Sequence, residues 1–307
     1  MQKPRFASQR SADRRTLSDW ATRSARRLDA AKVHFGHGAP DAVSEAVWII
    51  SYACRLSPRH IEKHHSRLLT SSQIDRADRI LEMRIKGRTP LAYLLKEAWL
   101  GRHRFFVDQR VIIPRSFIAE FIETGLADWL PHGRRKLRAL DLCTGSACLA
   151  VVLAKTFRGV HVDAVDISGP ALEVANINVK RHQLQSRVRA ILGDLFEEIP
   201  ESVRYDVIVS NPPYVRTSSM RTLPTEYRHE PTLALSGGTD GLALVSRILA
   251  SARQYLTPKG VLVLEIGHNK KAMEKAFPRL PILWLDTPGS EGMLALIEAR
   301  DIPAQSS

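Results

Sequence analysis

The stretch "LRALDLCTGSACLA" (residues 137–150) decides the fold, because within it one regular structure gives way to another. Residues 137–143 have the composition of a buried strand, and residues 146–157 have the pattern of a helix. Gly145 allows a tight turn between them, and the small Ser146 and Ala147 leave room for a ligand at the helix N-terminus. The segment therefore predicts a strand, a turn and a helix. The turn either binds a ligand or has a purely structural role.

The same alternation continues to the end of the chain. Further strands are expected at 160–167, 188–194, 205–211, 260–267, 282–287 and 292–299, and further helices at 170–183, 242–256 and 269–277. Apolar strands separated by helices are typical of a parallel sheet that is covered on both faces. The sequence therefore predicts an α/β fold.

Acidic residues stand at the ends of the first three strands. Asp141 belongs to the first, and Asp166 ends the second, 21 positions after Gly145, where an acid can accept the hydroxyls of an adenosine ribose. Asp194 follows the third and can accept from an adenine amino group, with Leu195 against the ring. Each acid alone also fits an ordinary helix cap or strand end. Since parallel strands share one carboxyl edge, the three together predict a crevice for an adenosine-containing cofactor rather than a pyrophosphate cradle, which needs three glycines.

The motif "NPPY" (211–214) follows the fourth strand on the same edge. Two adjacent prolines lock the backbone and donate no hydrogen bond, so the motif presents rigid acceptors. The side-chain oxygen of Asn211 and the carbonyl oxygen of Pro212 can accept the two N–H groups of one planar amide or amine nitrogen. Adjacent prolines also start ordinary loops, but an amide before them and an aromatic ring after them favour a binding role.

The N-terminal third has a different character. Residues 1–35 carry nine basic and three acidic residues and are expected to form a solvated basic arm or a partly helical surface segment, here bounded as 1–37. Residues 38–96 predict a small helical domain, with helices begun by Asp41, by Ser57-Pro58 and by Ser72. Residues 97–114 predict a β-hairpin linker that turns at 108–110, and the second domain is expected over 115–307, starting with a helix over 116–129.

The overall composition indicates the kind of surroundings in which the protein works. The chain has 307 residues and a net charge of +13, which favours polyanionic surroundings such as nucleic acid or an RNA-rich assembly, although it also serves solubility. Three cysteines at spacings that fit no zinc site indicate a reduced, cytoplasmic protein without a metal. No apolar run is long enough to span a membrane.

Taken together, "DLCTGSAC", "VDIS", "GDLF" and "NPPY" resemble the class I S-adenosylmethionine-dependent methyltransferases that alkylate planar nitrogens. More narrowly, "VIIPRSFIAEFI" (111–122) and "LPTEYRHEPTLALSGGTDGL" (223–242) resemble the protein glutamine N(5)-methyltransferases, and "PRSFIAE" and "EYRHEP" resemble the branch that modifies a glutamine of ribosomal protein L-three. The resemblance covers about residues 40–300. It implies a Rossmann-like, mostly parallel seven-stranded sheet joined to an N-terminal helical domain for substrate recognition.

The resemblance also implies roles for matching residues. The methionine part of S-adenosylmethionine is assigned to a set formed by Asp141, Cys143, Thr144, Gly145, Ser146 and Ala147, the ribose to Asp166, and the adenine to Asp194 and Leu195. The substrate amide is assigned to Asn211 and Pro212, with Pro213 and Tyr214 beside it. The family usually has glycine where this chain has Ala147, which matters if that position needs a positive φ.

Two loop features are less specific. The segment between the fourth strand and the next helix is long enough to be a lid or binding loop, and in it Glu226, Arg228, His229 and Glu230 either contact the protein substrate or face solvent. Arg115 is interpreted as a structural ion pair that joins the two domains rather than as a substrate contact.

Other substrates stay open at this stage. The same motifs fit a glutamine of peptide release factors or an exocyclic amine of RNA or DNA, and a non-catalytic RNA-binding assembly factor would keep the scaffold without the chemistry. Ribosomal protein L-three, or an assembly intermediate that contains it, is the expected partner, with rRNA contacted through the basic arm.

Overall fold

The computed structural model describes residues 16–56, 63–131, 136–287 and 289–303, which form two compact units. We call them the helical unit, up to Leu95, and the sheet unit, from Lys96 onward. Each is described by itself.

The helical unit contains four helices, α1 (Leu17–Ala30), α2 (Ala42–Ala53), α3 (Ser71–Gly87) and α4 (Leu91–Leu95), among its described residues. Helix α1 lies in the segment 1–37, for which a solvated basic arm or a partly helical surface segment was expected, and it agrees with the helical alternative. Thr16 and Asp19 cap each other's backbone N–H groups at its start, and its apolar side, including Trp20 and Leu28, is buried. The indole of Trp20 donates to Asp78 of α3 at 2.9 Å, so α1 belongs to the helical core. Residues 1–15 lie outside the described part.

The starts of α2 and α3 test the capping predictions. Asp41 caps α2 as expected, since its carboxylate accepts from the backbone N–H of Ser44 at 2.7 Å. The cap of α3 is Thr70 rather than Ser72, because Thr70 forms a reciprocal capping box with Gln73. The helix expected at Ser57-Pro58 falls outside the described residues.

The linker hairpin lies earlier than its apolar pattern suggested. Strands β1 (Ala98–Leu100) and β2 (His103–Phe105) pair antiparallel around Gly101, whose φ of +54° suits a tight turn. The predicted turn at 108–110 is wrong as a hairpin, because the chain after Phe105 runs against helix α7 (Gly169–Arg181), where Asn178 binds both the N–H and the carbonyl of Phe106.

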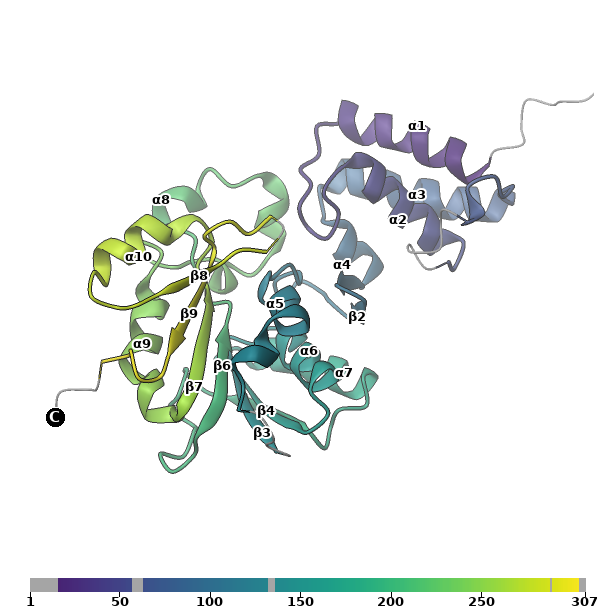
Figure 1. Ribbon diagram of the computed structural model, residues 1–307. Helices are drawn as coiled ribbons and strands as arrows, with labels where there is room; N and C mark the ends of the chain where they lie inside the picture. Colours follow the sequence, from purple (N-terminus) through teal and green to yellow (C-terminus); the bar gives the residue numbers. More distant parts are fainter. Residues whose placement is uncertain (1–15, 57–62, 132–135, 288, 304–307) are drawn as a thin grey trace, which may run out of the picture. The chain divides into compact units, whose positions relative to one another are not determined.

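The sheet unit is built on seven strands within the described residues, in the order β5-β4-β3-β6-β7-β9-β8 (Figure 1). Their bounds are β3 (Leu137–Leu142), β4 (Val160–Asp166), β5 (Val188–Leu192), β6 (Tyr205–Ser210), β7 (Leu256–Glu265), β8 (Leu283–Leu285) and β9 (Leu294–Glu298). Strands β3 to β7 run parallel, and β9 is antiparallel to both of its neighbours. This order confirms the α/β class and the mostly parallel seven-stranded sheet.

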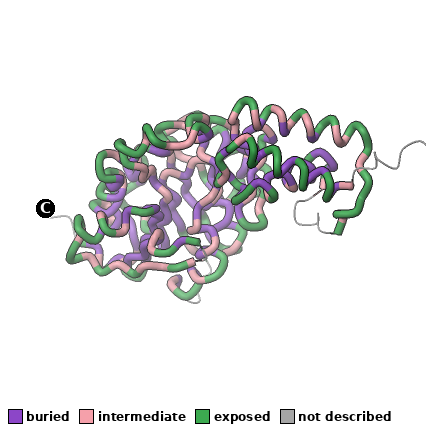
Figure 2. Tube along the Cα trace, turned by 90° about the horizontal axis from the view of Figure 1, so that it is seen from above, coloured by how far each residue is buried: buried purple, intermediate pink, exposed green. Residues whose placement is uncertain are grey.

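Helices cover both faces of this sheet. Figure 1 places α5 (Ile118–Thr124), α6 (Cys148–Thr156) and α7 on one side, and α9 (Ala243–Tyr255) and α10 (Lys270–Ala276) on the other. Leu140 and Leu142 of β3 pack in one core with Val245 and Ile248 of α9 and Met273 of α10. Figure 2 shows buried chain concentrated inside the sheet unit and exposed chain around it.

Short helices complete the unit: η2 (Leu126–Trp129), α8 (Thr217–Met220), η3 (Thr225–His229), η4 (Thr232–Ala234) and η5 (Gly267–Asn269). The helix expected over 116–129 is divided into α5 and η2 at Gly125. In the described parts of the chain, no helix is both long and apolar enough for a membrane span.

Candidate active site at the carboxyl edge of the sheet

The chain order reverses between β3 and β6, so the loops after these two strands lead to opposite sides of the sheet. Ligands of open α/β sheets bind at such a switch point, outside the carboxyl ends of the strands. Leu142 and Ser210 are paired in register, and the Ser210 hydroxyl donates to the Leu142 carbonyl at 2.8 Å. Cys143 and Asn211, the residues that follow, are thereby held side by side.

A cavity of about 320 Å³ opens at this place. The predicted residues that line it are Cys143, Gly145, Asp166, Asp194, Leu195, Asn211 and Pro213. The predicted residues that are not part of its lining are Asp141, Thr144, Ser146, Ala147, Pro212, Tyr214 and Glu230. The structure thus brings residues from four strand ends to one crevice.

Asp141 organises the turn from behind. Its Oδ2 accepts from the hydroxyl of Thr144 at 2.5 Å and from the backbone N–H of Ala150 at 3.1 Å, which ties the strand end to α6. Its Oδ1 is buried without a hydrogen-bond partner in the described structure. Burial raises the pKa of this carboxyl to about 7. A ligand with a positive charge or an N–H donor nearby would favour its ionised form.

Left-handed backbone is concentrated at the rim of the crevice. Gly145 has a φ of +54°, and Cys143, Ala147 and Leu195 have values of +57°, +59° and +57° without being glycine. Such strain of non-glycine residues persists where the surroundings enforce it, and it is frequent at functional sites. Ala147 therefore occupies the positive-φ position for which the family's usual glycine is suited.

We expect Ala147→Gly to change the free energy of unfolding by less than about 1 kcal/mol. Relief of the left-handed strain is offset by the loss of one buried methyl group and by the greater freedom of glycine in the unfolded chain. Ala147→Val should lower it by about 3 kcal/mol, because a branched side chain must fit a fully buried site at positive φ. Urea unfolding measures both, with Ala276→Val at the exposed end of α10 as control. Equal stability of the two Ala147 variants would contradict this account.

Asp166 connects the turn after β3 to the start of α7. Its two oxygens accept from the backbone N–H groups of Gly145 at 2.8 Å and Ser168 at 2.9 Å, while Ser168, rather than Asp166, caps α7. Burial raises its pKa, and these two bonds oppose the rise. Each oxygen keeps a further lone pair, which is what two ribose hydroxyls require.

Asp194 carries a partner that the sequence did not indicate. Arg247 of α9 donates to its Oδ2 at 3.0 Å, and both residues line the cavity. The Arg247 side chain is half exposed, so the pair is open to exchange with a ligand. Leu195 and, from α9, Leu244 add apolar wall beside this pair.

Asn211 provides the clearest sign of a binding function. Its side-chain Oδ1 is buried and has no hydrogen-bond partner within the described residues, although buried acceptors are nearly always bonded. Asn211 and Pro213 both line the cavity. An acceptor in this state is suited to receive an N–H group from a ligand.

Three glycines fit closely around Tyr214. A Cβ atom added at Gly237 would lie 2.6 Å from the Cα of Tyr214, one at Gly241 would lie 2.5 Å from the Tyr214 carbonyl oxygen, and one at Gly267 would lie 2.6 Å from the Tyr214 ring. On the other side, the Tyr214 hydroxyl donates to Glu265 Oε1 at 3.3 Å. Burial raises the pKa of both groups, so the phenol stays protonated. The Tyr214 ring is therefore held in a fixed position at the end of the "NPPY" motif, but Tyr214 does not line the cavity.

Glu230 is engaged by the protein itself. Its carboxylate is fully buried and accepts from Arg115 at 2.5 and 2.7 Å and from the backbone N–H of Ile113 at 3.1 Å. These bonds join the loop between β6 and α9 to the segment before α5. Arg115 therefore forms an ion pair, but within the sheet unit rather than between domains. A substrate contact through Glu230 requires that these bonds be given up, so we assign it to loop anchoring. Glu226 is also buried, whereas Arg228 is exposed and His229 is partly exposed.

Sequence reasoning missed Arg247, Glu265 and the glycines around Tyr214. The signal available was weak, namely one of the two arginines of a helix, an acid near the end of "VLVLEIG" and glycines spread over the chain. No group of three or more His, Cys, Asp or Glu side chains in the described ranges is arranged to hold a metal ion.

The fold and the switch-point crevice define a methyltransferase. Residues 124–226 match the family model described as "Methyltransferase small domain". Among solved structures, the catalytic domain of human Mettl16 is similar in fold, with a TM-score of 0.53 over 83% of this chain and 94% of that one, at 13% identity.

Curated relatives carry the identification further. The ribosomal protein uL3 glutamine methyltransferase of Bordetella pertussis is 48% identical over 94% of this chain and 96% of its own length. The proteins of the same name from Burkholderia pseudomallei and Bradyrhizobium diazoefficiens are each 42% identical over 94% of this chain, covering 96% and 92% of theirs. The chain belongs to the ribosomal protein uL3 glutamine methyltransferases, and the family resemblance of its motifs is confirmed.

Proposed function

We propose that this enzyme transfers a methyl group from S-adenosylmethionine to the side-chain amide nitrogen of a glutamine in ribosomal protein L-three. The observation that carries the proposal is the buried, unpartnered Oδ1 of Asn211 beside the cavity. The names of the relatives support the substrate, and the motif supports the chemistry.

The residues present fit the cofactor. The cavity lies within the usual size range of ligand sites, roughly 300–1,000 Å³. Asp141 has a buried free oxygen behind the turn, where it favours a positive charge, and Asp166 has lone pairs for two hydroxyls. Asp194, Leu195 and Leu244 offer one acceptor and apolar surface, as an adenine ring requires. We assign the methionine, ribose and adenine parts to these groups, with Cys143, Gly145 and the buried Thr144, Ser146 and Ala147 shaping the turn.

Bound S-adenosylmethionine supplies an electrophilic methyl group, so the protein's task is to present the amide. An amide nitrogen is a poor nucleophile because its lone pair is delocalised into the carbonyl. Accepting both N–H groups, at Asn211 Oδ1 and the Pro212 carbonyl, orients the nitrogen and favours the positive charge that grows on it. The buried setting strengthens both hydrogen bonds. Pro213 and the closely packed Tyr214 keep these acceptors rigid.

The biological setting follows from the proposed substrate. L-three is the partner, free or within a ribosome assembly intermediate, and the modification takes place in the cytoplasm. The rRNA contact expected of residues 1–37 stays a prediction. Within residues 1–37, helix α1 has the exposed side chains of Arg23 and Arg26, and the first fifteen residues are outside the described structure.

Methyl transfer from labelled S-adenosylmethionine tests the proposal. Purified enzyme is incubated separately with L-three, with a peptide release factor and with rRNA, and the labelled residue is located by mass spectrometry. We expect label on one glutamine of L-three. Label in RNA alone, in the release factor alone, or in none of them overturns the assignment.

A further inference from the structure

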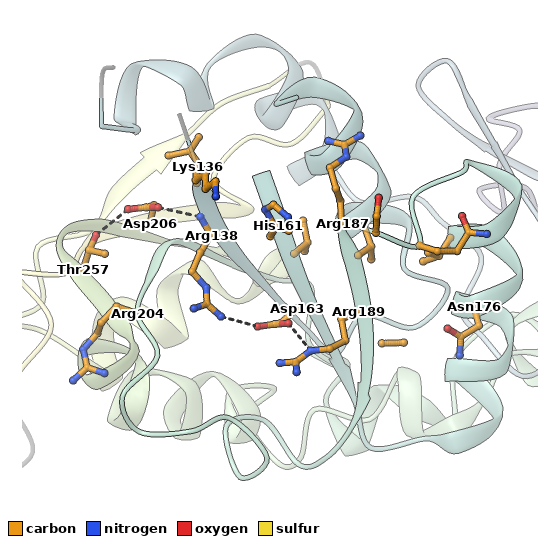
Figure 3. A pocket seen from close by; sticks show the side chains of 17 residues that line it. Lys136, Arg138, His161, Asp163, Asn176, Arg187, Arg189, Arg204, Asp206 and Thr257 are labelled. Atoms are coloured by element: carbon orange, nitrogen blue, oxygen red, sulfur yellow. Dashed lines mark hydrogen bonds and ion pairs between the residues drawn. The ribbon is translucent and has the colours of Figure 1, made fainter. Parts of the chain in front are cut away.

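The larger hollow of the sheet unit lies at the opposite edge from the active site. It has a volume of about 980 Å³ and is lined by the first residues of β3, β4, β5, β6 and β7, including Arg138, His161 and Arg189 (Figure 3). The crevice around Asn211 lies at the last residues of the same strands. Strands of about six residues separate the two edges by roughly 20 Å. Both can therefore be engaged at once.

This hollow, which we call the basic groove, has an excess of positive charge. Its lining includes five Lys or Arg residues and two acids, namely Lys136, Arg138, Arg187, Arg189 and Arg204 against Asp163 and Asp206. Asp206 is occupied by the backbone N–H of Arg138 at 3.0 Å and by Thr257 at 3.5 Å. The acids thus leave a net charge of +3 in the groove.

The arginines of the groove are held in place but remain exposed. Asp163 accepts from Arg189 Nε at 2.9 Å and from the Tyr205 hydroxyl at 2.7 Å, and it lies 3.6 Å from Arg138. Figure 3 shows Arg138 and Arg189 reaching Asp163 from either side. Their side chains are 49% and 63% exposed, so their remaining N–H donors face solvent.

Arg187 has a different role, because it donates to the carbonyls of Ala154, Phe157 and Arg158 at the end of α6. That arginine is structural. The remaining buried charge near the groove arginines is that of Asp163. One guanidinium neutralises it and the Tyr205 hydroxyl donates a hydrogen bond to it, so the other cations are not needed for this purpose.

The spacing of the cations indicates an extended anion. They lie on or just before β5, β3 and β6 rather than converging on one point, and these strands span three strand spacings, or roughly 15 Å. The described lining contains no Phe, Tyr or Trp ring on which a base can stack, and the imidazole of His161 is its single aromatic ring. Guanidinium groups match phosphate oxygens in a bidentate manner, so backbone phosphates rather than bases are the fitting ligand.

We propose that the basic groove binds the phosphate backbone of structured RNA. The choice of RNA over other polyanions rests on the proposed function, since a ribosomal protein reaches its modifying enzyme alone or attached to rRNA. The groove would hold such RNA while the opposite edge of the sheet receives the glutamine.

The test compares two double variants of the full chain. Lys136→Gln/Arg189→Gln removes two groove charges, and Lys275→Gln/Arg279→Gln removes two exposed charges at and after the end of α10. Binding to a labelled RNA hairpin is followed by anisotropy over a series of salt concentrations. We expect the groove variant to bind about tenfold more weakly near 0.1 M salt and to lose roughly two units of the salt slope, at about 0.9 per phosphate contact. The α10 variant should match the unmodified chain.

Methylation of isolated L-three serves as the second readout. Both variants should retain it, so a failure of RNA binding is distinguished from a failure of the proposed function. Equal loss of RNA affinity in both variants, or none in the groove variant, overturns the proposal. So does a groove variant that loses affinity for polyglutamate but not for RNA, which would indicate an acidic protein instead. Lys136→Gln/Arg204→Gln replaces the first variant if thermal melting shows that it does not fold.

Discussion

Asn211→Ala should lower kcat by about a thousandfold, or roughly 4 kcal/mol of transition-state stabilisation, while cofactor affinity stays within twofold. The side-chain oxygen removed is one of the two acceptors proposed for the reacting amide. It has no protein partner in the described structure, so its loss leaves no donor unpaired and should not lower the melting temperature. Turnover with labelled cofactor, calorimetric binding and thermal melting measure the three quantities.

The outcome separates catalysis from structure. Asn176→Ala is the matched control, because Asn176 is an exposed asparagine of α7 remote from the crevice, and it should leave kcat unchanged. A parallel loss of cofactor affinity and turnover in Asn211→Ala, or a clear drop in its melting temperature, would mean that Asn211 supports the fold and does not hold the substrate.

Arg115→Met should lower the stability of the sheet unit by about 3 kcal/mol and raise the KM for the protein substrate. Glu230 is fully buried, and without Arg115 its carboxylate loses the charged group that binds both of its oxygens. Breaking a buried pair by removing one partner is far more costly than removing an exposed one. The loop between β6 and α9 carries Pro231, Leu233 and Ser236 of the cavity wall, so its release affects binding.

An exposed pair provides the comparison. Arg189→Met removes a guanidinium that also binds a carboxylate at 2.9 Å, but its side chain is largely in solvent, so the loss should be below about 1 kcal/mol. Arg115→Lys should fall between the two, because an ammonium group cannot form both bonds of the bidentate pair. Urea unfolding followed by tryptophan fluorescence measures all three. Equal effects of Arg115→Met and Arg189→Met would show that the loop does not depend on this contact.

Much of the fold could be read from local pattern. The strand containing Asp141, the turn at Gly145 and the following strands and helices were predicted to within a few residues, because a buried parallel strand and a covering helix each have a strong period of their own. The packing of helix α1 into the helical core was not predicted, because its arginines outweigh a narrow apolar stripe that becomes evident only when Trp20 packs and bonds to Asp78. The hairpin was misplaced because Val107, Val111 and Ile113 are apolar for burial in the core and belong to no strand.

The candidate site divides in the same way. By itself, the sequence determined which residues end the strands, and therefore that Asp141, Asp166, Asp194 and Asn211 meet at one edge, since parallel strands share their direction. Only the tertiary structure decided which groups remain available to ligands. The sequence made Glu230 a candidate substrate contact, but in the structure its carboxylate is bound by Arg115. Asp141 and Asn211, in contrast, each keep a buried oxygen without a partner in the described structure. A hydrogen bond between residues more than a hundred positions apart forms only in the packed fold, so the local pattern of apolar and polar residues in the sequence cannot predict it.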